Sequence, residues 1–401
     1  MSLTAVTKAD SSVGPAASFN PGRVYSVDLL RGMVMIIMAL DHTREYFSNI
    51  EFAPGDLAHT YGALFFTRWI SHFCAPAFFF LAGVSIFLSA KKGPELSSFL
   101  WKRGLWLVFL ELTLVASLWS FTLTPTPRFI VIWALGWAMV AMSVLVRAPL
   151  RYSAICGIGL ILLHNLFDGV KPAAFGKFDW LWMILHRVGV YHLHSSYLPK
   201  YFLVIYPLIP WIGVMAAGYA LGSILKKPER QRRRFLLVTG TVMVTLFLVL
   251  RATNLYGDPP AGTGFEGSGP FKPQATTMLS VIAFLNVEKY PPSLDFLLMT
   301  LGPALMLLAW FDKLNFQSSI GKVWKSIAIY GQVPMFYYIV HLFLIHLLAV
   351  TIAWLFHRPE NSFGLPMVYC FWLAVVLLLY LPCRWFAGLK RRRKDWWLSY
   401  L

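Results

Sequence analysis

The chain has 401 residues, of which 58% are hydrophobic, 16% are aromatic and only 13% are charged. This composition excludes a soluble globular domain and indicates a multi-pass membrane protein. The formal net charge of +17 comes from short Lys and Arg clusters between apolar runs, a pattern that is typical of membrane topology signals and argues against nucleic-acid binding.

The chain divides into three predicted regions. Residues 1–23 are rich in Ser, Ala, Gly and Pro and lack a signal-peptide pattern, so we expect a disordered cytoplasmic tail. Residues 24–388 hold the apolar runs and form the expected membrane domain. Residues 389–401 contain "KRRRK" at 390–394 and are expected to form a basic cytoplasmic tail.

A membrane-spanning helix needs about 20 mostly apolar residues to cross a hydrocarbon core of roughly 30 Å. The sequence therefore predicts an all-α fold with about ten transmembrane helices. They fall at 25–46, 64–90, 104–121, 129–146, 152–168, 201–224, 235–250, 294–311, 326–355 and 366–387. The ninth segment is long and contains Pro334, which predicts a kink or a short interfacial helix before the crossing.

The first predicted span ends in "MIIMALDHTREYF", residues 35–47. Asp41 lies about 20 Å along the helix axis from Asp28, which places Asp41 and His42 in the outer third of the membrane. An interfacial helix end, with side chains reaching water, explains Arg44 and Glu45. Because ionisable groups inside a membrane usually serve function, we predict a functional role for His42.

The second predicted span contains Arg68 and His72, which are four residues apart and share one helix face at a depth similar to that of His42. His72 also fits a core histidine that bonds to a neighbouring helix. The ninth span contains His341 near its middle, and we expect its side chain to line a cavity. His346 lies on a different face, where helix contacts explain it.

Two long connections, at about 169–200 and 251–293, are expected to form functional loops over an extracytoplasmic cleft. Lys and Arg gather instead in the connections that follow the even-numbered spans, which places both termini in the cytoplasm.

The sequence contains no recognisable metal motif. The histidines come without a carboxylate cluster or an HExxH pattern, and the "HLH" at 192–194 is better interpreted as part of a loop. The histidine pattern therefore predicts no catalytic metal. The four cysteines have no CxxC partner, so we expect neither a disulfide nor a structural zinc.

The chemistry of the first span suits two classes of protein. A neutral imidazole can take a proton from a hydroxyl or amine that attacks an activated acyl group, and Asp41 would orient the ring and stabilise its charged form. The same groups suit a proton-coupled membrane transporter or exporter, which is the alternative function.

Six stretches occur in the order of a known family: "RVYSVDLLRGMVMIIMALDHTREYF", "APAFFFLAGVSIFLS", "IVIWALGWAMVAMSVL", "YPLIPWIGVMAAGYALG", "VEKYPPSLDFLLMTLGPALMLL" and "GQVPMFYYIVHLFLIHLLA". Together they resemble the bacterial branch of the heparan-α-glucosaminide N-acetyltransferase catalytic-domain family, part of the transmembrane acyltransferase group. The resemblance implies an inner-membrane enzyme that takes an acyl group, usually acetyl, from cytoplasmic acetyl-CoA and delivers it to an extracytoplasmic amino sugar or sugar hydroxyl. By position it points to Asp41 and His42, and His59 corresponds loosely to a histidine on the first outer loop of lysosomal members.

This function predicts where the substrates bind. Coenzyme A is too charged to cross the membrane, so cations at the cytoplasmic rim are the expected phosphate partners, namely Arg31, Lys102, Arg103, Arg147 and Arg151. Lys289 in "KYPPS" is expected to orient the acceptor or a loop, and Pro291 to Ser293 predict a stiff helix start.

The predicted reaction has His42, or alternatively His72, removing the acceptor proton while Arg44 or Arg68 stabilises the oxyanion. A transient acyl-histidine is the other route, and both remain open. The small-residue stretch "GVMAAGYALG" suits either a homodimer seam or packing within the chain.

Overall fold

The computed structural model describes residues 25–123, 126–193, 200–260, 268–314, 318–393 and 395–400. The tail predicted over 1–23 lies outside these residues, as does His194 of the "HLH" stretch. The structure is 74% helical with almost no strands among the described residues, which confirms the predicted all-α class.

The helices of the first half are α1 (Tyr25–Phe47), α2 (Gly62–Ser71), α3 (Cys74–Leu88), α4 (Gly93–Leu110), the π-helix η1 (Glu111–Val115), α5 (Ala116–Ser120), α6 (Val131–Leu145), α7 (Leu150–Leu163), η2 (His164–Phe167), η3 (Pro172–Phe178) and α8 (Asp179–His186). Those of the second half are α9 (Leu208–Leu225), α10 (Glu229–Thr253), α11 (Thr277–Leu285), α12 (Leu294–Phe311), α13 (Ser319–Gln332), α14 (Pro334–Phe356), α15 (Leu365–Arg392) and η4 (Trp396–Ser399).

Seven helical segments of the described chain are long and apolar enough to cross a membrane. They are Gly62–Leu88, Leu150–Phe167, Leu208–Leu225, Glu229–Thr253, Leu294–Phe311, Pro334–Phe356 and Leu365–Arg392. Helices also occupy the other predicted spans, but α1 carries charges near both ends and α6 has only 15 residues. The count of ten and the cytoplasmic termini therefore stay predictions.

One helix start differs from the prediction, and one predicted helix break is present. The segment predicted as a helix from residue 201 begins with strand β3 (Tyr201–Val204), and α9 starts at Leu208, because the residue before Pro207 favours an extended backbone. The predicted ninth span is two helices, α13 and α14, separated at Val333. Pro334 opens α14, where its missing N–H costs nothing, so the expected break at this proline is present.

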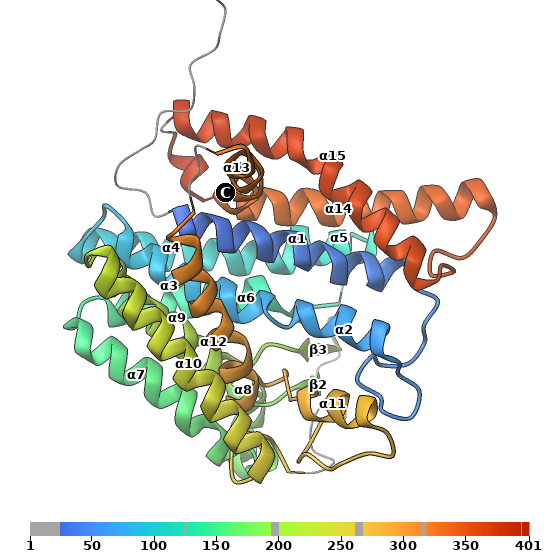
Figure 1. The fold of residues 1–401 in the computed structure, drawn as a ribbon, viewed down its shortest axis with the longest axis horizontal. Helices are drawn as coiled ribbons and strands as arrows, with labels where there is room; N and C mark the ends of the chain where they lie inside the picture. The colour runs from blue at the N-terminus through green and yellow to red at the C-terminus, as the bar shows by residue number, and fades with distance from the viewer. Residues whose placement is uncertain are drawn as a thin grey trace, which may run out of the picture.

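Helix α1 occupies the centre of the bundle. Figure 1 shows it crossing the middle of the molecule, with α13, α14 and α15 on one side and α7, α10 and α12 on the other. It contacts α2, α3, α12, α13, α14 and α15. A side chain on α1 can therefore meet residues that are hundreds of positions away in the sequence.

Glycines allow α1 to approach α13 very closely. A Cβ at Gly32 would overlap the backbone carbonyl of Ile327, and one at Gly331 would overlap that of Asp28. In α9, Gly218 meets the backbone of α3 at Phe80 in the same way, so the small residues of "GVMAAGYALG" pack within the chain.

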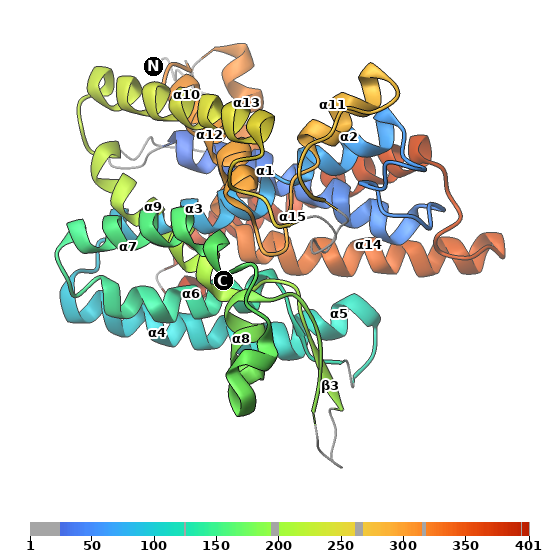
Figure 2. The same ribbon diagram turned by 90° about the horizontal axis from the view of Figure 1, so that it is seen from below.

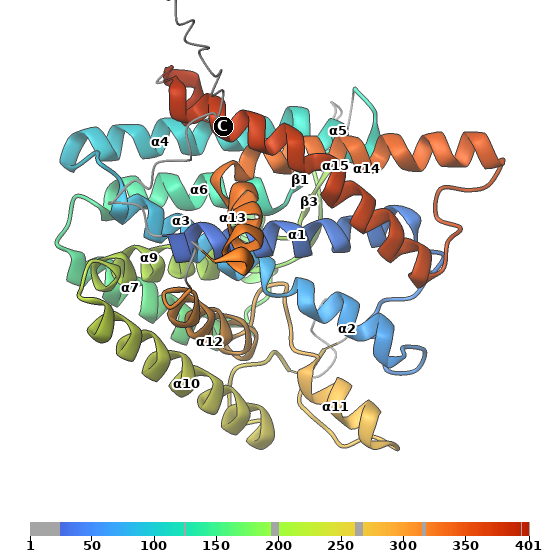
Figure 3. The ribbon, with the colours of Figure 1, turned by 45° about the horizontal axis from the view of Figure 1, so that its top comes forward.

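Small elements cover the Phe47 end of α1. A three-stranded sheet has the order β1 (Arg128–Phe129), β3, β2 (Gly189–His192), with β1 parallel and β2 antiparallel to β3. Its hairpin projects from the bundle near α8 and α5 (Figure 2). Helices α2 and α11 lie side by side in the same region (Figure 3). The long connections predicted as functional loops thus contain ordered structure.

Candidate active site

A cavity of about 1190 Å³ extends along α1. Its wall includes Arg31, near the Tyr25 end of the helix, and Arg44, near the Phe47 end. These two positions are about 20 Å apart along a helix axis. One cavity therefore connects the two ends of the bundle.

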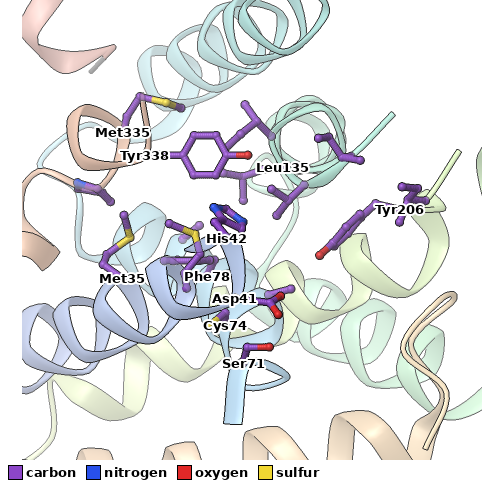
Figure 4. Close-up of a pocket in the computed structure, with 18 of the residues that line it drawn as sticks. Met35, Asp41, His42, Ser71, Cys74, Phe78, Leu135, Tyr206, Met335 and Tyr338 are labelled. Atoms are coloured by element: carbon purple, nitrogen blue, oxygen red, sulfur yellow. The ribbon is translucent and has the colours of Figure 1, made fainter. Parts of the chain in front are cut away.

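His42 lies in the middle of this cavity. Figure 4 shows its ring between Tyr338 on one side and Asp41 and Cys74 on the other. The ring of Trp119 packs edge-on against it, with 5.0 Å between ring centroids. The imidazole is thus held by neighbours from α14 and α5 while it faces the open space.

A chain of two hydrogen bonds defines the proton positions on His42. His341 Nδ1 lies 2.9 Å from the carbonyl oxygen of Tyr337, which can only accept, so Nδ1 of His341 carries the proton. In the neutral ring, His341 Nε2 is then an acceptor. It lies 2.7 Å from Nδ1 of His42, so His42 donates to it. This assignment leaves the lone pair of His42 on Nε2, the nitrogen that is free to react.

His341 acts from behind His42. Its side chain is fully buried, and its ring stacks on that of His42 with centroids 4.9 Å apart and planes 18° from parallel. The prediction that His341 lines the cavity is wrong: the cavity wall includes His42, and His341 packs against His42 without lining it. His346 lies on a different face of α14. It bonds to the carbonyl of Leu118 and stacks on Phe121, as expected for a histidine that makes contacts between helices.

Asp41 is paired with two arginines. Its Oδ2 accepts from Arg68 at 2.6 Å, and its Oδ1 accepts from Arg44 at 3.2 Å. The hydrogen bond that orients the His42 ring is donated to His341, and not to Asp41 as the sequence predicts. Asp41 instead holds the two guanidinium groups in the cavity wall beside His42.

Lys289 adds a third cation at this end of the cavity. Its side chain lines the wall although the residue is only 4% exposed, and its Nζ lies 5.0 Å from the ring centroid of Tyr290. Ser293 caps the helix that follows by accepting from the N–H of Phe296, as the "KYPPS" stretch predicted. Cations from three segments therefore surround the space next to His42.

His59 and His72 lie away from the cavity wall. His59 is exposed, and its ring bonds to Asp56 at 2.7 Å; this bond lowers the pKa of the Asp56 carboxyl below its usual range. His72 is 2% exposed and packs against Phe296. Neither nitrogen of His72 has a hydrogen-bond partner among the described residues.

Of the five predicted phosphate partners, Arg31 and Arg103 line the Tyr25 end of the cavity. Arg31 donates to the carbonyl of Gly331 and to the hydroxyl of Ser85. The remaining three point elsewhere: Lys102 is exposed, Arg147 bonds to Ser97, and Arg151 packs on Tyr152.

Sequence reasoning missed several cavity residues. Lys91 and Lys390 line the same end as Arg103, although both had been interpreted as topology signals only. Tyr338 lies one helical turn before His341 in the printed "FYYIVH", and that spacing was a usable signal. Tyr206 comes from the turn before α9, where no pattern pointed to a site.

A known protein family matches more than half of the chain. Residues 23–255 match the model for the family described as "Heparan-alpha-glucosaminide N-acetyltransferase, catalytic". The matched region contains Asp41, His42 and Arg68, whereas Lys289 and His341 lie beyond it. A comparison with curated proteins finds no match.

Proposed function

The chain belongs to the heparan-α-glucosaminide N-acetyltransferase catalytic family, and we propose that it transfers an acetyl group from cytoplasmic acetyl-CoA to an amino sugar or sugar hydroxyl outside the cytoplasmic membrane. Family membership makes it a membrane acetyltransferase. The donor, the acceptor and the direction of transfer are our proposal. The family match gives no support to the transporter alternative.

The observation that carries the proposal is the continuous cavity that joins a cationic rim to the reactive nitrogen of His42. An acetyltransferase that works across a membrane needs such a path, because the charged part of coenzyme A stays at the surface while its thioester must reach the acceptor. The rim cations would bind the phosphates, and the arm of the carrier would lie along α1.

The mechanism uses the assigned lone pair. The hydroxyl oxygen or amine nitrogen of the acceptor attacks the thioester carbonyl, and His42 Nε2 takes the proton that this atom loses. The carbonyl becomes an oxyanion beside Arg44, Arg68 and Lys289. When the intermediate collapses, the carbon–sulfur bond breaks, and the thiolate of coenzyme A takes the proton back from His42.

His341 supports the charged state of the ring. When Nε2 of His42 gains a proton, Nδ1–H already donates to a neutral acceptor, so the bond to His341 becomes charge-assisted and stronger. A covalent route uses the same atom: Nε2 attacks the thioester carbonyl, and the carbon–sulfur bond breaks to release the thiolate. The acceptor then attacks the acetyl-imidazole, the carbon–nitrogen bond to His42 breaks, and the thiolate of coenzyme A takes the proton that the acceptor loses. Both routes require Nε2 without a proton at the start.

The experiment that tests this function uses the full chain in proteoliposomes. Acetyl-CoA with a labelled acetyl group is supplied on one side, and a panel of amino sugars and sugar alcohols is supplied on the other. We expect labelled acetylated sugar to form on the acceptor side. The proposal fails if no panel member is acetylated and acetyl-CoA is not consumed.

A further inference from the structure

A second cluster of reactive side chains lies outside the cavity. It consists of His164, which opens η2 after α7, Asp168, which follows η2, and His186, which ends α8. The two histidines are 1% and 0% exposed, and Asp168 is 9% exposed. None of the three lines the cavity of His42, so the proposed transfer reaction does not use them.

The histidines of this cluster are under-bonded. Both ring nitrogens of His164 and Nδ1 of His186 are buried without a hydrogen-bond partner among the described residues. Leaving a buried polar atom unpaired destabilises the folded protein. His186 Nε2 does have a partner, Asp168 Oδ1 at 3.0 Å, so the fully unpaired ring is that of His164, and it points to a group that binds one of its nitrogens.

The donor set matches a metal ion. One ligand atom from each of His164, Asp168 and His186 can be chosen so that all three lie within 4.8 Å of one another. Imidazole nitrogen and carboxylate oxygen are zinc ligands, and bonds of about 2.1 Å in a tetrahedral site put ligand atoms about 3.4 Å apart. The 3.0 Å between His186 Nε2 and Asp168 Oδ1 is already close to that spacing.

Neighbouring residues hold the carboxylate in place. Asn165 donates its side-chain amide to Asp168 Oδ2 at 2.8 Å and accepts from the N–H of Leu294. Arg187 donates to the backbone carbonyl of Asp168. Hydrogen bonds of this kind around a ligand are the usual support of a metal site.

We propose that His164, Asp168 and His186 bind one zinc ion, with a water molecule as the fourth ligand. The ion ties the end of α7 to the end of α8 and, through Asn165, to the start of α12. It would serve as a structural clamp for the connection over the Phe47 end of the bundle, separate from the acetyl-transfer site. The earlier expectation of no structural zinc rested on the cysteine pattern, which this histidine–aspartate set does not involve.

The test is metal analysis of the purified full chain in detergent. We expect about one zinc per wild-type chain, because a preformed buried site binds zinc tightly. His164→Gln, Asp168→Asn and His186→Gln should lose most of it. The matched control is His192→Gln, an exposed position in β2 only a few residues from His186, and it should keep the full zinc content.

A second measurement covers variants that fail to fold. Wild-type protein is treated with a chelator and then titrated with Co²⁺, which gives visible absorption bands of high intensity in a tetrahedral site. Chelation should also lower the melting temperature of the wild type. Wild-type protein that carries no zinc and takes up neither zinc nor cobalt overturns the proposal, and so does a control variant that loses zinc as the ligand variants do.

Discussion

His42 donates a hydrogen bond from Nδ1–H to Nε2 of His341, with 2.7 Å between the two nitrogens. The two residues are 299 positions apart in the sequence, so this bond joins α1 to α14. Because His341 is itself anchored by the carbonyl of Tyr337, the pair has one consistent neutral arrangement. The free lone pair is therefore on Nε2 of His42, and the ring that carries it lines the cavity.

Replacing His42 removes the proposed base. We expect His42→Ala to lower acetyl transfer by about 10²–10⁴-fold, the usual contribution of a general base, while acetyl-CoA still binds. Labelled transfer and binding by calorimetry measure the two effects. His59→Gln is the control, since His59 is exposed and lies off the cavity wall. Wild-type turnover in the His42 variant would show that another group carries the reaction.

His341 is a positioning residue, since it acts through His42. We expect His341→Ala to lower kcat by about 10²-fold with little change in KM, because a misplaced base costs rate and not substrate affinity. His341→Gln, whose side-chain carbonyl can accept the same bond, should recover part of the loss. Steady-state kinetics with acetyl-CoA separates kcat from KM. If the alanine and glutamine variants are equally slow with a raised KM, the residue only supports the fold.

The Tyr25 end of the cavity offers a comparison between adjacent cations. Arg103 lines the wall, whereas Lys102 is exposed and lies outside it. We expect Arg103→Gln to raise the KM for acetyl-CoA by about tenfold or more, because a hydrogen bond to a charged group contributes about 1.5–3 kcal/mol. Lys102→Gln should leave KM unchanged. Equal effects at both positions would favour general surface attraction over a phosphate site.

The close crossing of α1 and α13 predicts a stability difference between two glycines. A Cβ at Gly331 meets the carbonyl of Asp28, so Gly331→Ala should destabilise the protein by about 1–3 kcal/mol. Gly159 in α7 has open space around it, and Gly159→Ala should be neutral or stabilising by up to about 1 kcal/mol. Thermal unfolding in detergent compares the two variants. A lowered melting temperature for Gly159→Ala alone would contradict the packing described here.

Much of the fold could be predicted because length and hydropathy determine where helices occur in a membrane protein. The prediction of a functional role for His42 followed from the cost of placing ionisable groups inside the membrane. The contact with His341 could not be predicted, since helical periodicity assigns a residue to a face but does not identify the helix that the face will meet. The same limit explains why Arg103 and Lys102 could not be told apart.

The start of α9 was misjudged for a different reason. The run from Tyr201 onward is apolar enough for a helix, but β1 and β2 pair with it and Pro207 holds its end extended. Pairing with distant strands overrides local preference. The triad of His164, Asp168 and His186 was missed because only His164 and Asp168 are near in sequence, and the third member arrives through the fold of the connection.

The crossing of Gly32 with α13 has a consequence for donor selection. With the two backbones in contact, α1 has no freedom to slide along α13, and Arg31 is bonded across the same junction. The span between the cationic rim and the imidazole is therefore a fixed length. We expect this fixed distance to favour acyl-CoA donors whose pantetheine arm has the same length. A coenzyme A analogue with a shorter arm would not bring its thioester carbonyl to His42.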